Sequence, residues 1–78
     1  MKIAGYIQHD IYKITIFDYG ARFVVKFENG PLEISYKLPK EEFSGFQEIE
    51  SNLSKQFYEK VDKIFEQLAD SAVDFFNS

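Results

Sequence analysis

The fold is decided by residues 22–38, which read RFVVKFENGPLEISYKL. Apolar and polar residues alternate on both sides of Asn29-Gly30, which is typical of two strands that each bury one face. Asn-Gly is a strong hairpin signal, because a type I′ turn needs a positive φ angle at both central positions. A two-residue loop there predicts three apolar pairs on one face: Phe27 with Leu32, Val25 with Ile34, and Phe23 with Tyr36. On the other face it pairs Lys26 with Glu33, whose charges are opposite.

Two earlier turns pass the same pairing test. A turn at Tyr19-Gly20 predicts these pairs: Ile16 with Phe23, Ile14 with Val25, and Tyr12 with Phe27. A turn at His9-Asp10 predicts these: Ile7 with Tyr12, Gly5 with Ile14, and Ile3 with Ile16. All three turns bury the same face, so the sequence predicts a four-stranded antiparallel meander in the order 1-2-3-4. The alternative for residues 2–17 is one long strand that bends around Gln8.

After Pro39 the pattern changes to apolar residues spaced three and four apart, which is typical of helices. These residues are Phe46, Ile49, Leu53, Phe57, Val61, Ile64, Phe65, Leu68, Ala72 and Phe76. One helix over residues 47–77 would be about 46 Å long, whereas four strands are only about 19 Å wide. We therefore expect a break near residues 51–54, where serine and asparagine can cap a second helix. The alternative is one long helix whose far end meets a second subunit.

The predicted fold is α+β (ββββα), with one face of the sheet covered by the C-terminal helix or helices. We expect one domain over residues 1–78, with the antiparallel sheet in residues 1–38 and the helical half in residues 40–77. Fourteen of the 78 residues are Phe or Tyr, so a core this small depends on aromatic packing or on a partner. Residues 1–40 hold six Lys and Arg against four Asp and Glu, and residues 41–78 hold three against nine. The first half is therefore mildly basic and the second half acidic.

Catalytic chemistry has little support in this sequence. The absence of Cys excludes disulfides, thiolate catalysis and Cys-ligated metal. His9 is the only His, and its place in a predicted turn favours a solvated surface residue over a metal ligand or a general base. The four glycines are isolated from one another, so no glycine-rich phosphate loop is present. We expect no catalytic residue, no cofactor and no metal site, and therefore no enzyme.

The sequence also bears on where the protein resides. Residues 1–6 lack the apolar run of a signal peptide. No stretch approaches the roughly 20 apolar residues that span a bilayer. We therefore expect a cytoplasmic protein with no membrane partner.

The outward face of the predicted sheet suggests one kind of partner. It carries cations beside aromatic rings: Tyr6, Lys13, Phe17, Arg22, Lys26 and Lys37. Such a face can hold a single nucleic-acid strand, with phosphates on the cations and bases on the rings. The alternatives are a self-contained cation–π pair of Arg22 with Phe17, or polar residues that only keep a half-exposed sheet soluble.

The C-terminus suggests another kind of partner. Phe75 and Phe76 lie within three residues of the chain end, and two rings there need cover from the protein's own core or from a second subunit. Our leading hypothesis is a non-catalytic interaction module that binds a protein partner or a second copy of itself as a homodimer. The alternative hypothesis is a single-stranded nucleic-acid-binding protein.

Two resemblances accompany this interpretation. The segments KITIF (13–17), RFVVKFE (22–28) and Tyr36-Lys37 resemble a family of small uncharacterised bacterial proteins of similar length, which implies one domain and no particular activity. Four strands followed by a helix, with Tyr36-Lys37-Leu38 leading into residues 42–46, are similar to Pur-alpha and Whirly-type proteins. That likeness implies a sheet that binds single strands, although basic and aromatic residues are sparser here than on such sheets.

Overall fold

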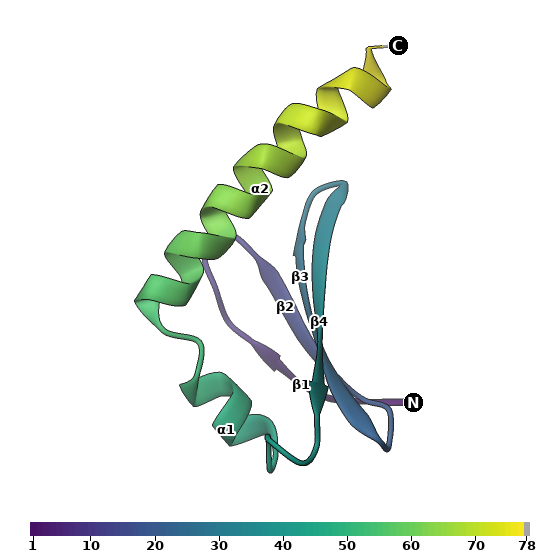
Figure 1. Cartoon of the computed structure of the whole chain (residues 1–78), viewed down its shortest axis with the longest axis vertical. Helices are drawn as coiled ribbons and strands as arrows, with labels where there is room; N and C mark the ends of the chain where they lie inside the picture. The colour runs from purple at the N-terminus through teal and green to yellow at the C-terminus, as the bar shows by residue number, and fades with distance from the viewer. Residues whose placement is uncertain (78) are drawn as a thin grey trace.

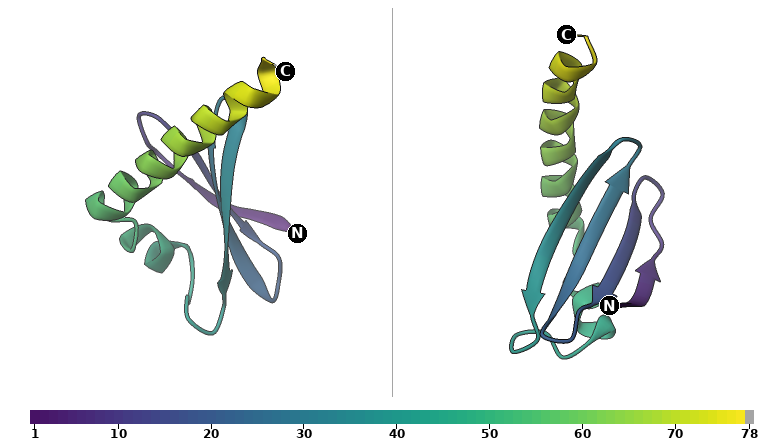
Figure 2. Two further views of the ribbon diagram at one scale, coloured as in Figure 1. Left: turned by 45° about the horizontal axis from the view of Figure 1, so that its top comes forward. Right: turned by 90° about the vertical axis from the view of Figure 1, so that its right-hand side faces the viewer.

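The computed structural model describes residues 1–77, and its elements form a sheet with two helices on one face (Figure 1). The strands are β1 (Lys2–Ile7), β2 (Lys13–Asp18), β3 (Arg22–Asn29) and β4 (Leu32–Pro39). They pair antiparallel in the order β1-β2-β3-β4, which confirms the predicted α+β meander. The helices are α1 (Phe46–Ser51) and α2 (Lys55–Phe76), and Figure 2 shows α2 crossing the sheet diagonally.

Beside each turn, the strand pairing is displaced by two positions from the predicted one, because each turn lies one or more residues later. The observed inward pairs include Phe27 with Ile34, Val25 with Tyr36, Ile14 with Phe27, Ile16 with Val25, and Ile7 with Ile14. The predicted partners are therefore wrong. A shift by two leaves each side chain on the same face, so the predicted buried face of β2 and β3 is correct.

The side chains beside the turns explain the displacement. The hairpin between β3 and β4 turns at Gly30-Pro31, and only Gly30 has a positive φ, of 61°. A glycine at the first central position fits a type II′ turn rather than the predicted type I′ turn. This turn removes Pro31, which has no N–H, from the strand ladder. In the hairpin before it, the Asp18 carboxylate accepts the Gly20 N–H at 2.9 Å and so fixes Gly20, with a φ of 87°, as the first turn residue.

A bulge in β1 changes the face of its first residues. The pairing of β1 with β2 shifts between Ile3 and Gly5, so Ile3 lies opposite Phe17 instead of the predicted Ile16. Ile3 is consequently on the outer side of the sheet and 49% exposed. Gly5 remains on the inner side, where the ring of Phe46 from α1 packs directly against its backbone.

The helical half consists of two helices separated by a turn at residues 52–54. Ser54 caps α2, because its hydroxyl accepts the Phe57 N–H at 3.2 Å. Glu48 steadies the start of α1 by accepting the N–H and O–H of Ser44 at 2.8 and 2.6 Å. These two hydrogen bonds lower the pKa of Glu48.

The core lies between the inner face of the sheet and the helices, and Phe27 is at its centre with no exposed surface. Its ring lies 6.0 Å from the ring of Tyr36, 5.9 Å from that of Phe57 and 6.3 Å from that of Tyr12. Val61 and Phe65 of α2 complete the buried cluster. Aromatic packing therefore supplies much of this small core, as the composition suggests.

We expect Gly5→Ala to destabilise the protein by about 1–3 kcal/mol, because the added methyl overpacks the site. A Cβ at this position would lie 2.5 Å from the Phe46 ring. The control is Gly45→Ala, where no atom lies within 4 Å of the new Cβ and the backbone is extended. Urea denaturation of both variants measures the difference. A Gly5→Ala protein as stable as the Gly45→Ala protein would contradict the close packing of α1 on β1.

Candidate functional site

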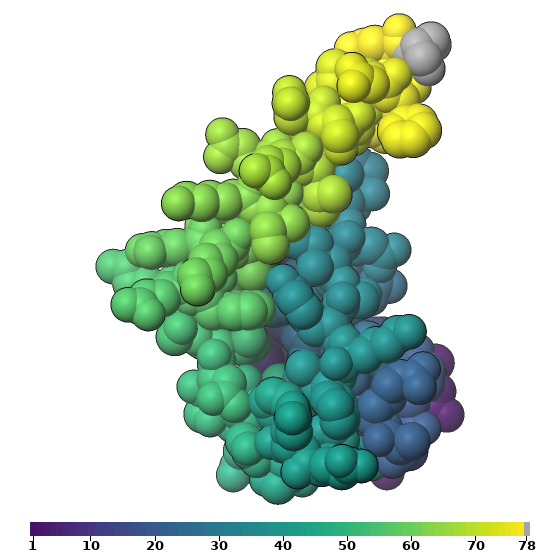
Figure 3. All heavy atoms as spheres, viewed as in Figure 1, coloured from purple at the N-terminus to yellow at the C-terminus, as the bar shows by residue number. Residues whose placement is uncertain are grey.

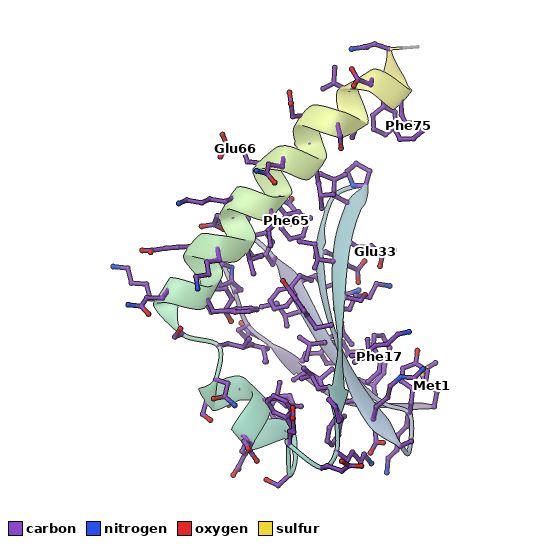
Figure 4. The ribbon with its side chains drawn as sticks, viewed as in Figure 1. Met1, Phe17, Glu33, Phe65, Glu66 and Phe75 are labelled. Atoms are coloured by element: carbon purple, nitrogen blue, oxygen red, sulfur yellow. The ribbon has the colours of Figure 1, made fainter. Side chains whose placement is uncertain are left out.

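The strand register brings all six predicted outward residues onto one face, here called the outer face, on the side of the sheet away from the helices. Figure 4 shows Phe17 and Glu33 pointing to that side. Successive rows across the sheet are Ile3–Phe17–Val24–Lys37, Tyr6–Thr15–Lys26–Ser35 and Lys13–Glu28–Glu33, with Arg22 beside Pro39 at one end. No helix of residues 1–77 covers this face (Figure 2).

Part of the outer face is apolar. Phe17 and Val24 lie side by side and are half-buried, and the exposed side chains of Ile3 and Tyr6 extend this patch over β1. The Tyr19 ring lies 6.3 Å from that of Phe17, and the Arg22 guanidinium lies 5.6 Å from the Tyr19 ring centre. Arg22 therefore stacks on Tyr19, and Phe17 is opposite Val24 rather than Arg22. Ile3 was not predicted on this face, and its place there follows from the bulge.

Cations are distributed evenly over the outer face, with one in each successive row: Arg22, Lys37, Lys26 and Lys13. Lys26 lies 3.1 Å from Glu33 and 3.9 Å from Glu28, and the hydrogen bond to Glu33, together with the charge of Glu28, raises the pKa of Lys26. The other three cations form no ion pair within residues 1–77. The face therefore offers three unpaired cations beside the apolar patch, with acids at only one end.

The C-terminal end of α2 is a second exposed surface. Val61 and Phe65 are buried against the sheet, whereas Leu68 and Ala72 are half-buried and the last helical residues are exposed. Phe75 is 84% and Phe76 71% exposed, which rules out their packing into the protein's own core. Figure 3 shows this end of the helix projecting beyond the rest of the molecule.

His9 belongs to a cluster that joins the loop of residues 8–12 to α2. Its ring lies between Tyr12 and Tyr58, with centroids 5.1 and 4.5 Å away, and its Nδ1 accepts the backbone N–H groups of Ile11 and Tyr12. The predicted surface residue His9 is half-buried between these two rings. With Nδ1 occupied by two donors, this ring orders a loop rather than serving as a base through that atom.

The hydroxyl of Tyr12 donates a hydrogen bond to the Asp62 carboxylate on α2, 50 residues away in sequence. Burial, followed by this hydrogen bond and the charge of Asp62, raises the pKa of Tyr12 to about 12. No local sequence signal marks such a pair, so it was not predicted. Tyr12 is only 5% exposed. We therefore interpret this hydrogen bond as a structural contact that holds the loop before β2 against α2.

Within residues 1–77, no three His, Asp or Glu side chains gather where they could hold a metal ion. None of the helices described has both the length and the apolar composition needed to cross a membrane.

Comparison with known proteins found no relative: no family model, no curated protein and no solved structure matches the chain. The resemblances to a bacterial family and to Pur-alpha and Whirly-type proteins therefore stay predictions.

The Tyr12–Asp62 pair predicts a loss of stability in alkaline solution. The folded pKa of about 12 lies above the ordinary value of 10, so the pair contributes fully below pH 10 and is lost as the pH rises from 10 to 12. We expect Tyr12→Phe to be less stable than the wild type by about 1–2 kcal/mol at pH 8, and the gap to narrow above pH 10. Urea denaturation at several pH values measures it. A stability difference between the wild type and Tyr12→Phe that stays constant up to pH 12 would exclude this role. Tyr58 is present in both proteins, so its titration affects both and serves as the internal control.

Proposed function

We propose that the protein is a non-catalytic interaction module that acts as a homodimer, with its two copies joined through the C-terminal ends of α2. The observation that carries this proposal is that the apolar stripe of α2 continues beyond the sheet. Phe76, 71% exposed, and Ala72 extend the same stripe that buries Val61 and Phe65. A helix presenting such a stripe to water is typical of a contact with another chain.

The distribution of charge on α2 supports a second copy as the occupant. At about 100° per residue, Leu68, Ala72, Phe75 and Phe76 fall on the side of the helix that also carries Val61 and Phe65. Glu66, Asp70 and Asp74 fall on the opposite side, and Figure 4 shows Glu66 and Phe65 pointing in opposite directions. Two helix ends can therefore pack antiparallel about a twofold axis with their acids turned outward.

The size of the surface indicates a modest interface. Two Phe side chains contribute roughly 300–500 Å² when fully buried, whereas a standard interface buries about 800 Å² on each partner. The remaining area is available at the hairpin between β3 and β4, which lies beneath the end of α2 in Figure 1. The half-buried Leu32 is at this hairpin end. We therefore expect a reversible dimer rather than an obligate one.

We expect Phe76→Glu to weaken self-association by about 30-fold or more, because loss of a central aromatic contact costs about 2 kcal/mol. Sedimentation velocity over a wide concentration range measures it. The matched control is Val73→Glu, which adds the same charge to an exposed apolar residue on the acidic side of the same turn. A wild-type protein that stays monomeric at the highest concentration would overturn the proposal, as would equal effects of the two variants.

A second candidate function is binding of single-stranded nucleic acid on the outer face. The observation in its favour is the arrangement of Arg22, Lys37 and Lys13 around the apolar residues Phe17 and Tyr6, on a face that no helix covers. Rings can stack on bases while cations contact phosphates. Glu28 and Glu33 oppose this function at one end of the face, where they neutralise Lys26.

Fluorescence anisotropy with single-stranded oligonucleotides at low and moderate salt tests this candidate. We expect Arg22→Ala and Lys37→Ala to weaken binding and to reduce the salt slope by about 0.7 for each lost phosphate contact. Lys26→Ala should have a smaller effect, because the charge of Lys26 is already paired. Lys60→Ala on α2 is the control for total charge. Binding that falls equally in all four variants, or no binding at low salt, would exclude a specific role for the outer face.

A further inference from the structure

A cavity of about 130 Å³ lies on the inner side of the sheet, apart from both surfaces described above. It is bounded by β3, β4, the segment before α1, α1 itself and the start of α2. The lining residues are Val25, Phe27, Tyr36, Leu38, Phe43, Ile49, Asn52, Leu53 and Phe57. No charged side chain is among them. Figure 3 shows the surface hollowed between the α1–α2 segment and β4.

One wall of the cavity is a group of three aromatic rings that support one another. The rings of Phe27 and Tyr36 are 6.0 Å apart and perpendicular, and the ring of Phe57 lies 5.9 Å from the first and 5.8 Å from the second. A ring that moved into the cavity would lose contact with the other two. This wall therefore resists moving into the cavity, because the three rings are packed as closely as molecules in an organic crystal.

The opposite wall is held away from β4 by the packing of α1 on β1. The Phe46 ring lies directly against Gly5, and Ile49 is buried on the same helix. Moving α1 toward β4 to close the cavity would break the contact of Phe46 with Gly5. The cavity is therefore built into the fold by anchors on both sides, and the inward residues of β4 beside it, Tyr36 and Leu38, stay only half-buried.

We propose that this cavity is a binding site for one uncharged apolar group of about six carbons, a small aromatic ring or the end of an alkyl chain. It opens to the surface (Figure 3), and its volume of about 130 Å³ is close to that of an enclosed engineered cavity of about 150 Å³ that binds benzene. The absence of charged lining residues excludes an ionised group from the interior, because a buried charge needs a partner. Asn52, which is exposed, and Tyr36 are the lining residues that carry polar groups.

The test is a titration of the whole protein with benzene and, separately, with 1-hexanol, followed by NMR of the methyl groups. We expect saturable shifts at Val25, Leu38, Ile49 and Leu53, with a dissociation constant of about 1 mM or below. The methyl groups of Val61 lie outside the cavity lining and should shift much less. Saturation by benzene alone assigns an aromatic ligand, and saturation by hexanol alone assigns an alkyl chain. Saturation by both supports the shared apolar chemistry.

A pair of matched variants on one strand locates the site. Leu38→Phe places a larger side chain in the cavity, whereas Ile34→Phe enlarges another half-buried inward residue of β4 that does not line the cavity. We expect Leu38→Phe to weaken binding at least tenfold and Ile34→Phe to leave it within about twofold. Leu53→Phe fills the cavity from the helical side and replaces Leu38→Phe if that variant fails to fold.

Three results overturn the proposal. The first is the absence of saturable methyl shifts with both probes. The second is a set of shifts spread over the whole protein and not centred on the lining residues. The third is equal binding by the wild type and a folded cavity-filling variant. None of these results depends on the oligomeric state or on nucleic-acid binding, so the proposal stands or fails separately from the proposed function.

Discussion

The packing of the Phe27 ring is the contact on which the rest of the structure depends. This ring, on the third of four strands, meets the loop before β2 through Tyr12, the edge strand β4 through Tyr36, and the first turn of α2 through Phe57. Three segments that are distant in sequence are thereby fixed relative to one another. The first turn of α2 is held at Phe27 through Phe57, and from there the helix continues diagonally across the strands (Figure 2).

That diagonal path explains why the molecule has such unequal surfaces. Two helices cover one face of the sheet, and a chain of 78 residues has no further element among those described to cover the other. A small domain buries a smaller fraction of its surface than a large one, so apolar residues remain at the outer face and at the end of α2. The angle between α1 and α2 leaves the cavity between them, on the side of β4. The three candidate sites are therefore consequences of one packing arrangement.

Alternation in the sequence was enough to predict the faces of the strands but not their partners. Each hairpin is displaced by two positions, and such a shift places Ile34 where Leu32 was expected without turning either residue outward. The pattern therefore cannot distinguish the two registers. Two features of the turns select the observed register. Pro31 lies in the turn, where it has no need of the N–H that it lacks, and the Asp18 carboxylate accepts the Gly20 N–H. The bulge in β1 was also hidden, because Ile3 is apolar and fits either face.

The candidate sites could be predicted only where they depend on local pattern. The six outward residues share a face because parity is preserved, and Phe75 and Phe76 are conspicuous at the end of an amphipathic stripe. The link between Tyr12 and Asp62 and the aromatic wall of the cavity both depend on the angle at which α2 crosses the sheet. The amino acids at residues 52–54, where the chain turns from α1 into α2, do not specify that angle.

The bulge in β1 has a consequence for how the protein stays separate from its neighbours. An open sheet has two edges with backbone groups able to pair with another chain, and here they belong to β1 and β4. The irregular backbone between Ile3 and Gly5 interrupts a continuous ladder along one edge. Along the other edge, Glu33 and Lys37 place charges, and Pro39 ends the strand without an N–H to donate. Both edges are therefore poor sites for a strand of another chain to pair with. This lowers the tendency of an aromatic-rich chain to form fibres.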